Sequence, residues 1–182
     1  MTPVPQRPET MTLLNDISED TDLRRLFGRF PTGVTALCAK GRDEPVGMTA
    51  SAFVAVSLDP PLVSVCIKRG SGTWRQLRTQ ERVGISFLGN GHAATARQLA
   101  QKTGERFLGL AFEATPDGAV FLTNATAWLE CSVEQEIAAG DHDIVLFHLH
   151  RAAVTDGILP LVFHSSDFHT LAPIDQPQAA SA

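Results

Sequence analysis

The first periodic segment of the chain is helical. Leu23, Leu26, Phe27 and Phe30 are spaced i, i+3, i+4 and i+7, so a helix through them carries one apolar face. Acidic and hydroxyl residues just before Leu23 supply helix caps and negative charge where the helix dipole favours it. The Pro-Thr-Gly segment at residues 31–33 ends this predicted helix.

After residue 33 the apolar positions mostly follow the pattern of β-strands. Runs rich in Val, Leu, Ile and Phe are separated by Gly, Pro and Asp, which form turns. Two more helices are predicted, at residues 73–78 and 93–101. The predicted strands are residues 34–39, 46–56, 62–67, 82–88, 125–137 and 142–155, with a hairpin at 138–141 and short strands near Leu161 and Phe168.

Strands outnumber helices, and successive strands are mostly joined by short turns. This order predicts a mainly β fold, an antiparallel β-barrel with a few peripheral α-helices. No Gly-x-Gly-x-x-Gly opens a predicted helix, which disfavours a dinucleotide-binding α/β fold. One domain is expected over residues 18–172, with tails at 1–17 and 173–182 that are mobile or lie on a neighbouring subunit.

Composition narrows the classes of partner. The 182 residues carry a net charge of −5 without a basic block, so no nucleic acid partner is expected. No stretch approaches the ~18 apolar residues of a membrane span, and no apolar signal segment opens the chain. Cys38, Cys66 and Cys131 lie in separate apolar runs, which fits buried thiols in a reducing compartment. A cytoplasmic protein with no membrane partner is expected.

Residues 47–53, Gly-Met-Thr-Ala-Ser-Ala-Phe, are small for a strand. Central strands usually carry large β-branched side chains. Small residues let a flat ligand lie against the backbone, whose N–H and C=O groups then contact its polar edge. The alternative is a strand packed tightly under a helix.

Residues 68–73, Lys-Arg-Gly-Ser-Gly-Thr, combine cations, glycines and hydroxyls before a predicted helix. Free N–H groups at a helix start favour an anion, such as a flavin or nucleotide phosphate. The alternative is a surface loop in which Ser71 or Thr73 is only the helix cap.

A histidine stands at the mouth of the predicted hairpin. His142 is flanked by two acids and could bond a ligand or titrate near neutral pH; the alternative is turn chemistry with an exposed histidine. His148 and His150 face one side of their strand, but they are only half a ligand set, so no metal is predicted. The sequence lacks the Gly-x-Ser-x-Gly and cysteine signatures of hydrolases.

Taken in order, these segments resemble the short-chain flavin reductase family, the reductase components of two-component flavin-dependent monooxygenases. The specific part is the run from residue 47 to 63 joined to the later Gly-Asp-His, and the resemblance extends over roughly residues 23–171. The matching segments are residues 30–35, 47–53, 56–63, 127–131, 140–142 and 160–164, together with Ser71 and Thr73.

The resemblance implies a split β-barrel that forms a homodimer, with flavin bound near the subunit interface. FMN is expected as the flavin rather than FAD. It implies that the strand through Met48, Thr49, Ala50 and Ser51 contacts the flavin ring, largely through backbone groups. Pro31, Thr32 and His142 would border the nicotinamide. The other implied contacts are Ser57, Cys66, Ser71 and Thr73 along the ribityl and phosphate path, with Phe163 and Phe168 closing the pocket.

The implied activity is reduction of free flavin by NADH or NADPH, with the reduced flavin passed to a partner monooxygenase. His142 would be the catalytic residue, orienting the nicotinamide or assisting a proton step. A flavin-retaining oxidase or oxygenase on the same barrel and a non-catalytic flavin-binding module remain alternatives. The chain departs from the family at residues 164–168, where relatives often carry basic residues, and it matches only loosely at 104–109.

Overall fold

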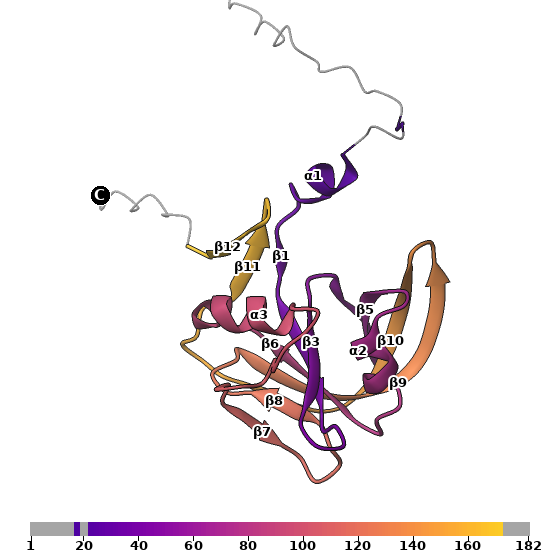
Figure 1. Ribbon diagram of the computed structural model, residues 1–182, viewed down its shortest axis with the longest axis vertical. Coiled ribbons are helices and arrows are strands. Elements are labelled where there is room, and N and C mark those ends of the chain that lie inside the picture. The colour runs from indigo at the N-terminus through magenta and orange to yellow at the C-terminus, as the bar shows by residue number, and fades with distance from the viewer. Residues whose placement is uncertain (1–16, 19–21, 173–182) are drawn as a thin grey trace, which may run out of the picture.

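A seven-stranded antiparallel sheet forms the body of the protein (Figure 1). The structure is a computed structural model that describes residues 17–18 and 22–172, so most of both predicted tails lies outside it. No helix in these ranges is long and apolar enough to cross a membrane. The helices are α1 Leu23–Phe27, α2 Gly72–Leu77, α3 Ala93–Leu99 and the 3₁₀-helix η1 Asn90–His92. The strands are β1 Thr32–Gly33, β2 Thr35–Ala39, β3 Val46–Ala50, β4 Phe53–Leu58, β5 Pro61–Lys68, β6 Val83–Phe87, β7 Phe112–Ala114, β8 Val120–Leu122, β9 Ala127–Ala139, β10 His142–Val154, β11 Leu161–His164 and β12 Asp167–Thr170.

The sheet is curled because its two edge strands follow one another in the chain. Its order is β3-β2-β6-β9-β10-β5-β4, and only Ser51 and Ala52 separate β3 from β4. Ala50 and Phe53 are three residues apart, so at most about 11 Å of chain joins the opposite edges. The Cys66 amide donates to the Ala52 carbonyl at 3.3 Å and holds this junction. The predicted mainly β, antiparallel barrel-like fold with few helices is confirmed.

The prediction of one strand over residues 46–56 is wrong. Ala50 still pairs with Thr35 of β2, whereas Phe53 pairs with Val65 of β5, so the chain changes neighbours at Ser51 and Ala52. Small and β-branched residues continue through the break, and an apolar pattern records burial rather than the identity of the neighbouring strand. The apolar pattern therefore did not reveal the break at Ser51 and Ala52, which joins the two edges of the sheet.

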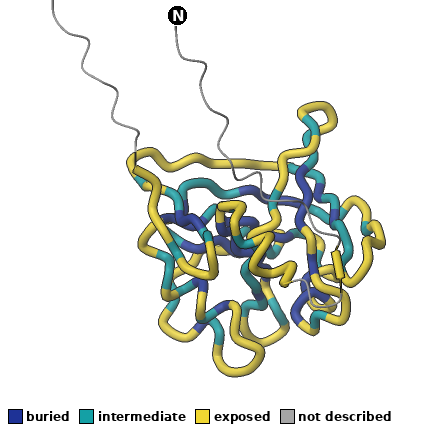
Figure 2. Tube along the Cα trace, turned by 90° about the horizontal axis from the view of Figure 1, so that it is seen from above, coloured by how far each residue is buried: buried dark blue, intermediate teal, exposed yellow. Residues whose placement is uncertain are grey.

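Two apolar clusters pack against opposite faces of β2, whose five residues are all buried. Leu37 and Ala39 join the cluster around Phe147, while Ala36 and Cys38 join the one that contains Ala96 and Leu99 of α3. Figure 2 shows the buried stretches gathered in the middle of the molecule, with the loops exposed around them. Burial on both faces explains why β2 reads as a continuous apolar run.

The N-terminal helix forms, but it ends at Phe27 with Gly28 as its C-cap, before the predicted end at residues 31–33, and its apolar side chains stay exposed in the single chain. Asp22 caps α1, since its carboxylate accepts a hydrogen bond from the Arg25 amide at 3.0 Å. Leu26, Phe27 and Phe30 are 53%, 68% and 74% exposed. Figure 1 shows α1 standing clear of the sheet.

Glu130 is a carboxylate buried within β9. Its side chain is 3% exposed and accepts hydrogen bonds from the Arg151 guanidinium and, at 2.8 Å, from the Thr115 hydroxyl. The bond from Arg151 is the main cause that lowers the pKa of Glu130, against the opposing effect of burial. The folded state therefore favours the ionised carboxylate. This stabilisation is complete above the usual glutamate pKa of 4.5 and is lost as the pH falls through the lowered value.

We expect Arg151→Met to lower the free energy of unfolding at pH 7 by about 1–3 kcal/mol, because it leaves a buried carboxylate without its cation. The loss should shrink as the pH falls from 4.5 through the lowered pKa of Glu130, where the carboxylate that Arg151 stabilises becomes protonated. Urea unfolding followed by circular dichroism at several pH values measures both effects.

The matched control for this experiment is Arg97→Met. It breaks an ion pair with Asp167 in which both side chains are exposed, so the expected loss is below about 1 kcal/mol. Equal losses for the two variants, or a loss for Arg151→Met that does not depend on pH, would contradict the role of the buried pair.

Candidate functional site

A cavity of about 540 Å³ opens where β3 meets β4, and we call it the junction cavity. Its volume falls in the ordinary range of small-molecule sites. Its walls come from β3, the Ser51–Ala52 junction, β5, the start of β10, helix α3 and the hairpin of β11 and β12. The predicted residues that line it are Met48, Thr49, Ala50, Ser51, Cys66, His142, Phe163 and Phe168.

The free edge of β3 forms one wall of this cavity. β3 is an edge strand of the sheet, so one side of its backbone faces away from β2. The Gly47 carbonyl lies on that outer side, where Arg106 Nη1 donates to it at 3.2 Å. Backbone groups of an antiparallel strand alternate in direction, so those of Thr49 face outward too. The wall thus combines small side chains with backbone donors and acceptors, as the sequence predicted for this strand.

Two aromatic rings and an arginine form the wall contributed by α3 and the last hairpin. The rings of Phe163 and Phe168 lie 5.4 Å apart, and the Arg97 guanidinium lies 4.8 Å from the centre of the Phe168 ring. Arg97 also contacts Asp167 at 3.5 Å. The hairpin turn holds Ser165 and Ser166 at φ values of 50° and 68°, a conformation that favours glycine. This part of the wall is therefore built from two rings tilted by 59° and a guanidinium that lies over one of them.

Cys66 is exposed and lines the junction cavity, so the expectation of three buried cysteines is wrong for this residue. Its neighbours Val65 and Ile67 point into the core, and alternation along β5 directs Cys66 to the opposite face. Cys38 and Cys131 are buried, and burial raises the pKa of each thiol to about 12. Cys66 is therefore the accessible thiol.

His142 stands at the start of β10 with its ring held by a neighbour. Its Nδ1 donates to the Asp141 carboxylate at 2.8 Å, because a carboxylate can only accept. This hydrogen bond is the main cause that lowers the pKa of Asp141. Asp143 is bound separately by Arg69 Nε at 2.8 Å. Both flanking acids are thus engaged, and His142 Nε2 is the ring nitrogen that can meet a ligand.

A second cavity of about 620 Å³ continues from the first, and we call it the loop cavity. The two share Met48, Thr49, Lys68 and Ala100. The residues that line the loop cavity include no acid but four cations, Lys68, Arg69, Lys102 and Arg106. A concave surface with this charge favours an anionic group.

Ser71 and Thr73 line the loop cavity, but each also has a structural role. The Ser71 hydroxyl accepts from the Trp74 amide at 3.1 Å and caps α2, so the alternative of a helix cap is confirmed for this residue. The Thr73 hydroxyl, largely buried, accepts from Arg106 Nη1 at 2.6 Å. Arg106 thereby ties β3 to the first turn of α2.

Three predicted residues lie outside these two cavities. Pro31 and Thr32 line a neighbouring cavity of about 340 Å³, which shares Val34 and Ser51 with the junction cavity. Ser57 is not among the residues lining any of the three, because β4 runs along the opposite edge of the sheet, where Ser57 pairs with Leu62. Its contact with a flavin stays a prediction.

The wall made by α3 and the cations that follow it were not predicted from the sequence. Ala96 and Ala100 are four residues apart, and this small-residue spacing on one helix face was a usable signal. Lys102 and Arg106 carried no such signal, since they lie in an irregular segment that only folding brings to β3.

Comparisons with known proteins point to one family. Residues 27–172 match the flavin reductase like domain. An NADH-dependent FAD reductase of Streptomyces globisporus is 34% identical over 175 residues, which cover 92% of this chain and 94% of that protein. The structure of the Streptomyces globisporus C-1027 NADH:FAD oxidoreductase in complex with NAD and FAD fragments has a TM-score of 0.79 at 32% identity, covering 87% of this chain and 98% of that one.

A third similar protein is the flavin reductase component of a bacterial two-component tryptophan halogenase. Its structure has a TM-score of 0.74 at 31% identity and covers 84% of this chain and 98% of its own. Two relatives from Rhizobium meliloti, 33% and 34% identical, are longer, and the match spans 42% and 56% of their lengths. The chain thus spans about half the length of those two curated relatives.

The family match includes all twelve strands of the described structure, from β1 to β12. The junction cavity and the loop cavity both lie inside the matched residues. The resemblance read from separate segments of the sequence is confirmed, and the chain belongs to the flavin reductase like domain family.

Proposed function

We propose that this protein is an NAD(P)H:flavin oxidoreductase that reduces free FMN or FAD. The observation that carries the proposal is the free edge of β3, which lines an apolar-walled cavity continuous with a cationic one. A flavin has a flat ring with a polar edge and a phosphate at the end of a flexible chain. The two connected cavities match these two parts in shape and in charge.

The junction cavity suits the ring. Met48, Thr49 and Ala50 leave room beside the backbone, and the outward groups of Thr49 can bond the polar ring edge. The tilted rings of Phe163 and Phe168 supply apolar surface on the far wall. The phosphate would then lie in the loop cavity among Lys68, Lys102 and Arg106 and beside Ser71 and Thr73.

Bound flavin supplies the hydride-accepting chemistry. The chain's part is to align the nicotinamide with the ring and to exclude water from between them. His142 Nε2, oriented through Asp141, would bond the nicotinamide or assist a proton step. Pro31 and Thr32 would border the nicotinamide from the neighbouring cavity, which reaches the junction at Ser51.

We also propose that the protein is a homodimer which passes reduced flavin to a partner monooxygenase. On the edge strand β4, Val54, Val56 and Leu58 are 55%, 48% and 96% exposed, and a second copy would cover this apolar edge. A similar protein is the reductase component of a two-component halogenase, which supports a partner that uses reduced flavin. The free thiols of all three cysteines support a reducing, cytoplasmic location.

The direct test mixes purified protein with FMN or FAD and with NADH or NADPH, and follows the loss of nicotinamide absorbance. Nicotinamide should be consumed only when flavin is present. Consumption in none of the four combinations would overturn the proposal. Flavin that stays bound through purification with little nicotinamide oxidation would indicate an oxidase instead, and binding without turnover would indicate a binding module.

His142→Ala should reduce kcat/KM for the nicotinamide about ten-fold, because the ring no longer orients that substrate. Flavin affinity, measured by fluorescence quenching, should change little. The control is His148→Ala, since His148 lies on the same strand but does not line the junction cavity. An unchanged rate of nicotinamide oxidation in His142→Ala would rule out the assigned role.

Cys66 should report occupation of the junction cavity. A thiol reagent should modify one cysteine rapidly in the native protein, and Cys38 and Cys131 only after unfolding, because both are buried. Saturating flavin should slow the rapid reaction, and Cys66→Ser should remove it. If saturating flavin leaves the rate unchanged, the flavin ring does not lie against β5.

A further inference from the structure

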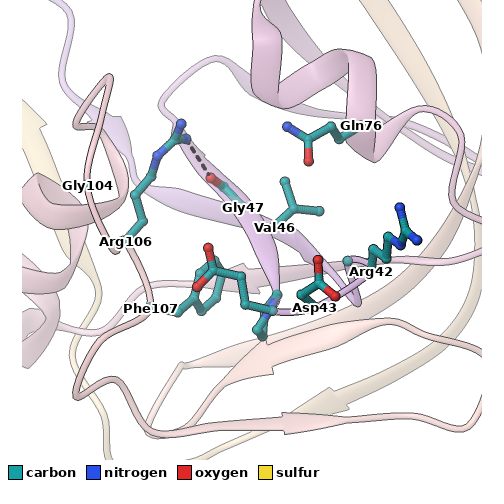
Figure 3. Close-up of a pocket in the computed structure, with 11 residues that line it drawn as sticks. Arg42, Asp43, Val46, Gly47, Gln76, Gly104, Arg106 and Phe107 are labelled. Carbon is teal, nitrogen blue, oxygen red and sulfur yellow. Dashed lines mark hydrogen bonds between the residues drawn. The ribbon is translucent and has the colours of Figure 1, made fainter.

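A third cavity, of about 550 Å³, lies at the start of β3, and the proposed reaction leaves it unused (Figure 3). We call it the end cavity. Its walls are the turn at residues 41–45, Gln76 of α2 and the segment 104–107. Figure 3 shows Gln76 and Arg106 facing one another across the strand at Gly47, with Phe107 below them and Arg42 and Asp43 on the other side.

The end cavity continues the line of the other two. Gln76 and Arg106 line both the loop cavity and the end cavity. The three cavities therefore follow β3 in order, from Ala50 through Met48 to Val46. At about 3.3 Å per residue, this part of the strand is about 13 Å long. A molecule longer than one ring and one phosphate would be guided along the strand into the end cavity.

Two glycines let the walls of this cavity pack closely. A Cβ on Gly47 would lie 2.6 Å from Cys38 Sγ and 2.8 Å from the Phe107 ring, so the strand packs directly on both. A Cβ on Gly41 would lie 2.2 Å from the Glu44 carbonyl, so the turn at 41–45 can close only with glycine there. Phe107 is 8% exposed and is braced edge-to-face by Phe112 at 5.8 Å. The cavity is thus bounded by firmly packed backbone and one aromatic ring.

The chemistry of the lining differs from that of the loop cavity. Arg106 stands at the entrance and can reach a second phosphate next to the first, with Gln76 as a neutral donor opposite. Farther into the cavity, the turn at residues 41–45 provides one positive side chain, Arg42, and two negative ones, Asp43 and Glu44. Carboxylates accept hydrogen bonds from ribose hydroxyls and from an exocyclic amino group. A cation at the entrance and acceptors beyond it suit a phosphate followed by a nucleoside.

We propose that the end cavity binds the adenosine monophosphate half of FAD, so that this chain selects FAD over FMN. The inference rests on the proposed function, because it assumes that the ring lies in the junction cavity and the first phosphate in the loop cavity. This preference is the opposite of the one expected from the sequence, which was FMN rather than FAD. FMN ends where the loop cavity ends, whereas FAD has a second phosphate and a nucleoside that reach Arg42 and its neighbours.

The test measures dissociation constants of FAD and FMN by fluorescence quenching without any nicotinamide. The wild-type protein should bind FAD about ten-fold or more tightly than FMN. Arg42→Glu should remove about ten-fold of the FAD affinity and leave FMN unchanged. Arg42 is exposed, so the change spares the core. Lys40→Glu is the matched control, since it makes the same charge change on an exposed neighbour that does not line the end cavity.

Other outcomes would overturn the proposal in distinguishable ways. Equal affinity for the two flavins, or an equal loss of both in Arg42→Glu, means that the end cavity takes no part of FAD, although flavin binding itself stands. If Arg42→Glu instead raises the KM for NADH with FMN as acceptor and leaves the FAD affinity unchanged, the end cavity binds the adenosine of the nicotinamide cofactor. Failure to bind either flavin would overturn the proposed function as well.

Discussion

The two-residue link between β3 and β4 is the constraint on which the rest of this structure depends. Because Ser51 and Ala52 join opposite edges of a seven-stranded sheet, the sheet must curl until those edges meet. The Ala52 carbonyl then accepts from Cys66, and the start of β10 comes to the same place through its pairing with β5. The junction cavity lies beside this link, and within the described residues no strand pairing joins β3 to β4.

An unpaired strand edge is usually a liability, because it can pair with another chain. In this protein the outer edge of β3 is covered in part by Arg106, which bonds both Gly47 and Thr73, and by helix α3. The rest of the edge faces three connected cavities. Backbone groups that would otherwise need a strand partner are therefore available to a ligand that lies along β3. Small side chains from Gly47 to Ala52 are what permits this approach.

The three connected cavities along β3 form a trough, and its parts differ in charge. The loop cavity is lined by four cations, of which Arg69 is bound to Asp143, while Arg97 of the junction cavity is bound to Asp167. The buried Glu130 keeps its charge through Arg151 on the neighbouring strand, away from the cavities. Among the described residues, Lys68 and Lys102 line the loop cavity without an ion pair, so these two cations are left for a ligand.

The sequence by itself determined the family, the mainly β class and most of the wall formed by β3, because residue size and alternation record local burial. It also singled out His142, Cys66, Phe163 and Phe168, which the structure brings to one cavity. Only the tertiary structure decided where the strand breaks, which thiol is exposed and that Arg97, Lys102 and Arg106 join the site. The physical reason is that pattern reports whether a residue is buried, whereas pairing between distant strands decides what lies next to it.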